Sequence, residues 1–142
     1  MRNLIAIFVL LVSTSVHAVD YIYAGGWSKH VGNTSDITNQ QHNFVGYERN
    51  HWIVGEFKNS FGKEAIIVGK TIDVFEQDDF KVKMAIGAVW GYHQCSRKEP
   101  PDDNPVICPA VAPMVSYEKY AVQPTVTILG SALVFTIRWK FE

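Results

Sequence analysis

The sequence predicts an all-β protein, an eight-stranded antiparallel up-and-down transmembrane β-barrel. Three observations predict this fold. Apolar and polar residues alternate with a period of two along most of the chain after residue 18, as they do in strands with two different faces. No sustained helical periodicity and no long apolar helix follow that point, so the chain could cross a bilayer only as a closed barrel. The length of 142 residues suits one domain.

The first eighteen residues have the features of a secretory signal peptide. Arg2 supplies a positive charge, residues 4–12 form an unbroken apolar run, and Val16-His17-Ala18 offers the small residues that cleavage needs. The apolar run is too short to span a bilayer, which takes about 20 apolar residues. We therefore expect residues 1–18 to be a signal peptide and residues 19–142 to form the barrel domain.

The C-terminal segment shows the clearest alternation. One face is apolar and the other carries two cations; the apolar face comprises Leu133, Phe135, Ile137, Trp139 and Phe141, and the other comprises Val134, Thr136, Arg138, Lys140 and Glu142. In a membrane barrel the apolar face points to lipid and the polar face lines the interior. The segment from Phe80 to His93 has the same pattern, with Phe80 and Tyr92 as aromatics at the two ends of its apolar face.

Eight segments qualify as strands and are long enough to cross a bilayer when tilted. They are Tyr21–His30, Gln40–Asn50, His51–Asn59, Lys63–Asp73, Phe80–His93, Pro109–Glu118, Ala121–Leu129 and Ala132–Phe141. The two longest connections follow the first and fifth strands. Because barrels of this kind have long outer loops and short periplasmic turns, we expect odd-numbered strands to end on the outer side. Four tryptophans near strand ends or in their outer halves fit a bilayer interface.

Composition excludes some partners and favours one covalent link. With 13 Lys and Arg against 14 Asp and Glu and no basic run, nucleic acid is not expected as a partner. Cys95 and Cys108 flank a polar, proline-rich segment, and an even pair in an exported chain predicts a disulfide. No set of Cys and His residues has metal-ligand spacing, so no metal or cofactor is expected.

His30 and Ser60 are the candidate catalytic residues. His30 closes the first strand, and Ser60 follows the third. Odd-numbered strands end on one rim, so the two side chains should meet there. A His beside a Ser can act as a general base toward the hydroxyl, and Lys58 or the turn amides of Phe61 and Gly62 are possible oxyanion donors. The ordinary alternative, a solvated His and a turn Ser, stays open.

The block WIVGEFKNSFGKEAIIVGKTI (residues 52–72) resembles the strand-turn-strand of the outer-membrane lipid A palmitoyltransferases. That family closes the strand with F-K-D-S-W, and here the motif reads Phe57-Lys58-Asn59-Ser60-Phe61. The N-terminal YIYAGGWSKH and the C-terminal third are similar to the family more diffusely. The resemblance implies transfer of a fatty acyl chain from phospholipid to lipid A, with His30, Asn59 and Ser60 as functional residues. Asn59 stands where the family has Asp, and Asn cannot accept a proton.

The sequence therefore predicts a monomeric barrel of the bacterial outer membrane whose partners are membrane lipids. Small residues would leave room in the lumen for one acyl chain; those expected there are Ala24, Gly26, Ser28, Gly55, Gly69, Gly87 and Gly91. Two alternatives to the acyltransferase stay open. One is a non-enzymatic barrel that uses the Cys95–Cys108 loop for surface contacts or envelope integrity. The other is a soluble periplasmic barrel that binds a lipid with its apolar faces turned inward.

Overall fold

The computed structural model describes residues 19–32, 35, 37–92, 95 and 106–141. Within this part of the chain all regular structure is β. The eight strands are β1 (Asp20–His30), β2 (Gln41–Arg49), β3 (Trp52–Lys58), β4 (Glu64–Gln77), β5 (Phe80–Tyr92), β6 (Val106–Tyr117), β7 (Val122–Leu129) and β8 (Ala132–Phe141). The segment expected to be a signal peptide, residues 1–18, lies outside the described residues. The described residues contain no helix that is long and apolar enough to cross a membrane.

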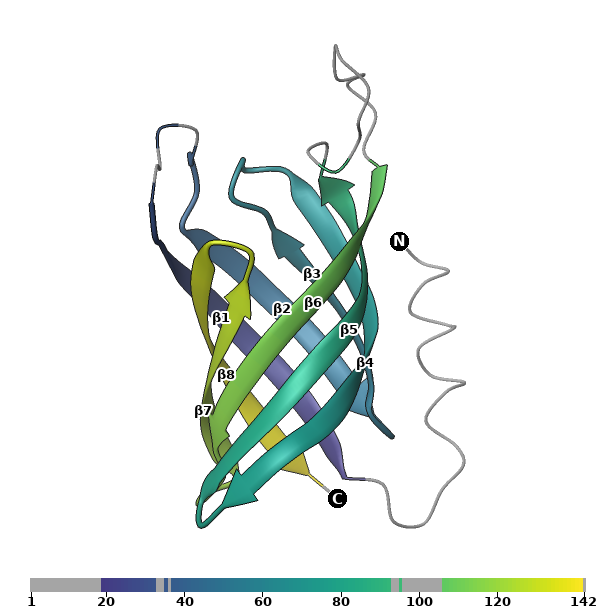
Figure 1. Cartoon of the computed structure of the whole chain (residues 1–142), viewed down its shortest axis with the longest axis vertical. Coiled ribbons are helices and arrows are strands. Elements are labelled where there is room, and N and C mark those ends of the chain that lie inside the picture. The colour runs from purple at the N-terminus through teal and green to yellow at the C-terminus, as the bar shows by residue number, and fades with distance from the viewer. Residues whose placement is uncertain (1–18, 33–34, 36, 93–94, 96–105, 142) are drawn as a thin grey trace.

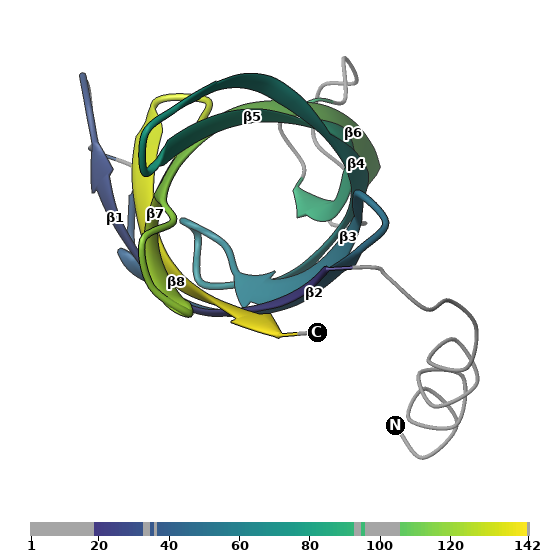
Figure 2. The same cartoon turned by 90° about the horizontal axis from the view of Figure 1, so that it is seen from below.

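The strands form one closed antiparallel barrel, which confirms the predicted eight-stranded all-β architecture. Each strand pairs with its neighbours in sequence, and β1 pairs with β8 to close the ring, as the end-on view shows (Figure 2). Odd-numbered strands end at the rim drawn at the top of Figure 1, here called the upper rim. β1 begins at the opposite, lower rim, and β8 ends there (Figure 1).

The two faces of β8 lie as the alternation predicts. Phe135, Ile137 and Trp139 are exposed on the outside of the barrel, whereas Arg138 is fully buried inside it. The four tryptophans share the outward orientation, and each exposes between 43% and 60% of its surface. The exterior is therefore a band of large apolar side chains, and the interior holds most of the buried polar ones.

Strand boundaries differ from the expected ones by more than one residue at two places. β4 continues to Gln77, four residues beyond its expected end, because a bulge between Asp73 and Phe75 carries the pairing with β5 past the irregularity. β6 begins at Val106 rather than at Pro109, which places Cys108 inside the strand. Proline lacks an N–H but keeps extended φ and a carbonyl acceptor, so it interrupts the hydrogen-bonding ladder without ending the strand.

Two glycine bulges change the direction of side chains in β1 and β5. Gly25 and Gly26 both have positive φ, and the register shifts there. As a result Ala24 points outward, contrary to expectation, while Gly26, Ser28 and His30 are buried inside. Gly91 has a φ of 110° and shifts the register between Trp90 and Tyr92. Tyr92 therefore turns into the barrel instead of joining the outer face as predicted, because a bulge adds one residue to a two-residue period.

The seam between β6 and β7 is the shortest ladder of the barrel. It has three register pairs, Met114 with Thr127, Val115 with Val126 and Ser116 with Thr125. Proline lies directly next to the ladder at both ends. Pro113 lies next to Met114 on the side of the upper rim, and Pro124 lies next to Thr125 on the side of the lower rim. Because proline has no N–H to donate to a strand ladder, the hydrogen-bonded pairing of β6 with β7 cannot extend normally past these two positions.

The lower half of the lumen is filled by a buried polar network, here called the floor. The Glu48 carboxylate accepts hydrogen bonds from Lys83 Nζ (2.7 Å), Thr71 Oγ1 (2.6 Å) and Tyr23 Oη (2.5 Å). Arg138 Nε donates to Gln123 Oε1 at 2.7 Å and pairs with the Glu118 carboxylate. The Lys83 and Arg138 cations both lie over the ring of Tyr21. Buried charges of both signs are thus paired and hydrogen-bonded, as low-dielectric surroundings require.

Candidate functional site

His30 and Ser60 meet inside the upper rim, as the topology predicts. His30 Nε2 lies 3.0 Å from Ser60 Oγ, although the residues are thirty positions apart in the chain. His30 exposes 8% of its surface and Ser60 exposes 7%. His30 Nδ1 is buried and has no hydrogen-bond partner among the described residues. The distance suits transfer of a proton between a hydroxyl and an imidazole.

Asn59 shapes the turn that presents Ser60. Its Oδ1 accepts hydrogen bonds from the backbone N–H groups of Phe61 and Lys63, both at 3.0 Å. The backbone of Asn59 also bonds across the turn, donating to the Lys63 carbonyl and accepting from Gly62 N–H. This carboxamide oxygen therefore caps the β3–β4 connection, and it holds the backbone on both sides of Ser60 in one conformation.

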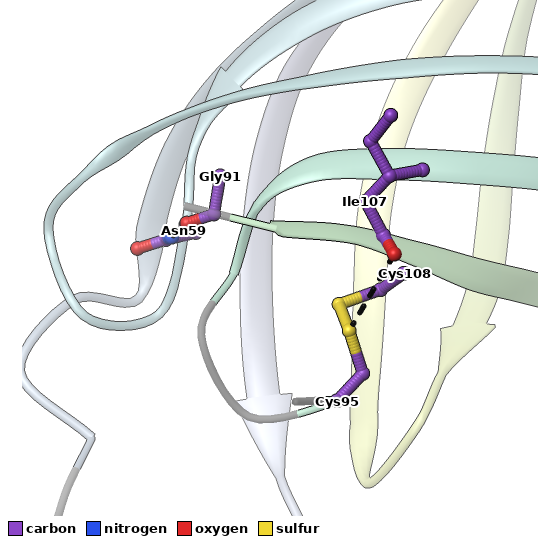
Figure 3. Close-up of a disulfide and its surroundings, with 5 residues drawn as sticks. All are labelled: Asn59, Gly91, Cys95, Ile107 and Cys108. Carbon is purple, nitrogen blue, oxygen red and sulfur yellow. Dashed lines mark hydrogen bonds between the residues drawn. A yellow bond between two sulfur atoms is a disulfide. The ribbon is translucent and has the colours of Figure 1, made fainter. Parts of the chain in front are cut away.

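The other end of the Asn59 side chain reaches β5. Nδ2 donates to the carbonyl oxygen of Gly91 at 2.8 Å, and Figure 3 shows the two residues side by side. Gly91 is the bulge residue that turns Tyr92 inward. An aspartate could not make this donation, which gives a physical reason for Asn at a position where the resembling family has Asp. Asn59 thus acts on Ser60 and Tyr92 through the backbone.

The connection between β1 and β2 packs over the same turn. The backbone N–H groups of Thr38 and Asn39 both donate to the Ser60 carbonyl at 3.0 Å. Asn39 Nδ2 donates to the carbonyls of Lys58 and Asn59 at 3.3 Å and 3.0 Å. Ser60 is consequently held from both directions by backbone hydrogen bonds, which fixes where its hydroxyl lies relative to His30.

A cavity of about 560 Å³ extends from this pair down to the floor. Its wall is mostly apolar and includes Phe57, Ile67, Val89, Ala112 and Met114, with His30, His42, Ser60 and Tyr92 on its polar side. The lining also includes Val111, which points to the outside of β6. The cavity therefore reaches the β6–β7 seam above Pro113, where register pairs between the two strands end.

The glycines expected to widen the lumen do not line this cavity. A Cβ atom at Gly55 would lie 2.6 Å from the ring of Phe44, which already covers that position. A Cβ atom at Gly87 would overlap the Val68 carbonyl, because β4 and β5 approach closely there. Small residues at these positions accommodate an aromatic ring and the curvature of the sheet. The small residues that line the cavity include alanines instead, among them Ala85, Ala110 and Ala112.

The oxyanion donors expected from the sequence are not available. The N–H groups of Phe61 and Gly62 are already donated to Asn59 within the turn. Lys58 is exposed on the outside of β3, since it alternates with the inward Phe57. Tyr92, by contrast, lines the same cavity as Ser60. The Gly91 bulge that directs Tyr92 inward is what the period-two reading of this strand missed.

A second His–Ser pair lies next to the first, and it was not predicted from the sequence. His42 Nε2 lies 2.7 Å from Ser28 Oγ, and His42 Nδ1 lies 2.6 Å from the Lys58 carbonyl oxygen. Both side chains are buried inside the barrel. The available signal was the alternation: Ser28 shares the inner face of β1 with His30, and His42 lies at an inward position of β2.

The predicted disulfide between Cys95 and Cys108 is present, with Cα atoms 5.7 Å apart. Cys108 lies near the start of β6, and Cys95 belongs to the connection that follows β5 (Figure 3). Both cysteines line the upper part of the cavity. The bond therefore ties the β5–β6 connection to β6, where Cys108 is paired with Val89 of β5. Most of the loop it closes lies outside the described residues.

No group of three or more His, Cys, Asp or Glu side chains in the described part of the chain could hold a metal ion. No protein-family model matches the chain, and comparison with curated proteins finds no match either. The case for function therefore depends on the geometry of the upper-rim site and on the resemblance carried by the Phe57–Phe61 motif.

Proposed function

We propose that this protein is an outer-membrane acyltransferase that moves a fatty acyl chain from a phospholipid to lipid A. The observation that carries the proposal is the contact between His30 Nε2 and Ser60 Oγ, 3.0 Å apart, at the mouth of a mostly apolar cavity. A base beside a hydroxyl provides an activated nucleophile, and an apolar cavity beside it can hold a hydrocarbon chain. The resemblance of the Phe57–Phe61 motif to the palmitoyltransferases supports this choice of substrates.

The exterior of the barrel supports the membrane placement. Large apolar side chains cover the outside, among them Ile86, Phe135 and Ile137. A soluble lipid-binding barrel would turn these faces inward, so their direction favours the membrane barrel. Trp27 and Trp90 lie toward the upper rim, and Trp52 and Trp139 lie toward the lower rim, which suits two interfacial belts. With odd-numbered strands ending outside, the upper rim would lie at the outer leaflet, where lipid A is found.

In the first step His30 Nε2 removes the proton from Ser60 Oγ, and the oxygen attacks the carbonyl carbon of the phospholipid ester. The ester C–O bond breaks, the lysophospholipid oxygen takes the proton from His30, and the acyl chain remains on Ser60. In the second step His30 removes a proton from a lipid A hydroxyl, which attacks the acyl-serine. Ser60 leaves and recovers its proton, so no oxidant or other co-reactant is needed.

Tyr92 is the side chain best placed to stabilise the oxyanion. Tyr92 lines the cavity together with Ser60, and the turn amides that were the other candidates are already bonded. A donor aimed at developing negative charge in a water-excluded site is typically worth a factor of about 10²–10³ in rate. In the tautomer in which His30 Nε2 accepts the Ser60 proton, the buried Nδ1–H has no protein partner among the described residues.

The β6–β7 seam is the proposed entry for the acyl chain. Three register pairs hold it, with Pro113 and Pro124 at their ends. The cavity meets the outer face of β6 at Val111. A lipid in the surrounding leaflet could thus insert its chain sideways while its headgroup stays at the upper rim, near Ser60.

Mass spectrometry of lipid A tests the proposal. The chain would be expressed in a bacterial host that lacks an equivalent enzyme, and outer-membrane assembly would be checked by heat-modifiable gel migration. We expect lipid A to gain the mass of one acyl chain. Ser60→Ala and His30→Ala should abolish this gain, whereas His51→Asn, a matched control in the lower-rim turn, should retain it.

A folded, membrane-inserted wild-type barrel that adds no acyl mass would contradict the proposal. The surface-contact alternative predicts the reverse dependence: deletion within the loop between Cys95 and Cys108 would remove the phenotype, while Ser60→Ala would leave it unchanged. No observation on the described residues favours that alternative, because most of the loop lies outside them.

A further inference from the structure

The second His–Ser pair links β1, which carries His30, to β3, which leads into the turn that holds Ser60. His42 lies on β2, between β1 and β3 in the sheet. Its Nδ1–H donates to the Lys58 carbonyl on β3 at 2.6 Å, and its Nε2 meets Ser28 Oγ on β1 at 2.7 Å. Because a carbonyl oxygen only accepts, Nδ1 must carry the hydrogen. In the neutral imidazole Nε2 is then an acceptor for the Ser28 hydroxyl.

The two anchors of this bridge lie two residues from the two members of the His30–Ser60 pair. Ser28 precedes His30 by two positions on the same inward face of β1. Lys58, whose carbonyl is bonded, precedes Ser60 by two positions. Strands β1 and β3 are not neighbours and lie about 9–10 Å apart across β2, by the usual strand spacing. The bridge therefore fixes the distance between β1 and β3, which is the distance that the His30–Ser60 contact also has to span.

We propose that His42 is a positioning residue, which with Ser28 holds His30 and Ser60 at reacting distance. This inference rests on the proposed acyltransferase. The burial supports it: Ser28 is fully buried, and a hydroxyl without a partner there would be costly. Ser28 itself does not line the cavity, so it is placed to support rather than to attack. The His42 ring packs against the Phe57 ring in a T-shaped arrangement, which limits its rotation.

The bridge acts on the rate of the chemical step rather than on lipid binding. A displacement of about 1 Å between reacting groups can cost roughly a hundredfold in rate. Removal of one end of the bridge should therefore lower kcat about 10- to 100-fold and leave KM within about twofold. Asparagine at position 42 places an amide N–H near the position of His Nδ1, so His42→Asn should keep the Lys58 contact and restore part of the rate.

The test uses the full chain folded in detergent micelles, with a fluorophosphonate that labels an activated serine and a phospholipid donor for acyl transfer. The variants are Ser28→Ala, His42→Ala and His42→Asn, with Gln41→Ala as the control because Gln41 is outward-facing on the same strand. We expect slower Ser60 labelling and a lower kcat for Ser28→Ala and His42→Ala, partial recovery for His42→Asn, and no change for Gln41→Ala.

Two results would overturn the inference. One is labelling of His42→Ala at the wild-type rate. The other is complete loss of labelling in both His42 variants, as in Ser60→Ala, which would make His42 the base itself. A wild-type protein that is labelled but transfers no acyl chain would count against the proposed function alone.

If the wild type is not labelled, the ¹⁵N chemical shifts of the His30 ring test the inference. A change of these shifts in Ser28→Ala but not in Gln41→Ala supports a positioning role, and no change in Ser28→Ala refutes it.

Discussion

The Glu48 carboxylate and the Lys83 ammonium lie 2.7 Å apart inside the barrel, on two strands that are not neighbours in the sheet. Tyr23 and Thr71 supply two further hydrogen bonds to the carboxylate. Removal of the cation alone would leave a buried charge without compensation. Lys83→Met should therefore lower the free energy of unfolding by about 3–5 kcal/mol.

Urea unfolding in detergent micelles, followed by tryptophan fluorescence, measures this effect. The double variant Glu48→Gln/Lys83→Met should recover most of the lost stability, since it removes both charges and keeps polar contacts for Tyr23 and Thr71. A double variant as unstable as Lys83→Met would show that the ion pair itself contributes the stability.

Asn59→Asp should destabilise the site although it restores the residue of the resembling family. A carboxylate cannot donate to the Gly91 carbonyl, 2.8 Å away, and would place two acceptors in contact. We expect a loss of about 1–3 kcal/mol in unfolding free energy and slower labelling of Ser60. Asn59→Ala should lose a similar amount of stability. Faster acyl transfer by Asn59→Asp would instead favour a direct role of position 59 in the chemistry.

Pro113→Val together with Pro124→Val should lengthen the β6–β7 ladder. Both changes introduce N–H donors directly next to the three register pairs, at positions where β-branched residues favour strands. Amide hydrogen exchange of Thr127 and Ile128 should become slower, and acyl transfer from phospholipid should slow with it. Unchanged transfer despite a longer ladder would exclude this seam as the entry for the acyl chain.

Loss of the disulfide should lower stability and leave the barrel fold intact. Cys95 and Cys108 are 13 positions apart in the chain, and a loop of this length corresponds to about 3 kcal/mol of restricted unfolded-state freedom. Cys95→Ala/Cys108→Ala should thus unfold at lower urea concentration, and dithiothreitol should reproduce the effect in the wild type. The reductant should not affect the double variant, and a further loss of stability there would point to another target.

The outward tryptophans should be quenched by brominated acyl chains in reconstituted vesicles. Trp27, Trp52, Trp90 and Trp139 are all exposed on the barrel exterior, and a bilayer interface would place them near the ends of the chains. Variants that retain one tryptophan each, with the others changed to Phe, should show stronger quenching by bromines near the headgroup than at the bilayer centre. Fluorescence unaffected by any brominated lipid would contradict the membrane placement.

The barrel could be predicted because the alternation of apolar and polar residues is repeated in one strand after another. The alternation in β8 alone assigns Ile137 to the outside and Arg138 to the inside, and the structure confirms both. The contact between His30 and Ser60 followed from topology, since strands of the same parity end on one rim. Features that break the period of two were missed, and the bulge at Gly91, which reverses the direction of Tyr92, is the clearest example.

The remaining parts of the site depend on contacts between distant residues. His42 and Ser28 are unremarkable in sequence, and their role becomes visible only when β2 places the imidazole between Ser28 and the Lys58 carbonyl. Asn59 was expected to be a functional residue beside Ser60, and its side chain bonds the backbone of its own turn and of Gly91. Spacing in the sequence could not show whether the Asn59 carboxamide bonds a side chain of the site or the backbone, because either choice provides it with hydrogen-bond partners.

The floor also has a consequence for what could pass through the barrel. Arg138, Tyr23, Gln123 and Glu48 are fully buried across the lower half of the barrel and bonded to one another or to neighbouring strands. A solute that entered from the upper rim would meet paired charges instead of a water path. Inserted in a bilayer, the protein should therefore conduct no ions and admit no antibiotics, and a cell could carry many copies without losing its permeability barrier.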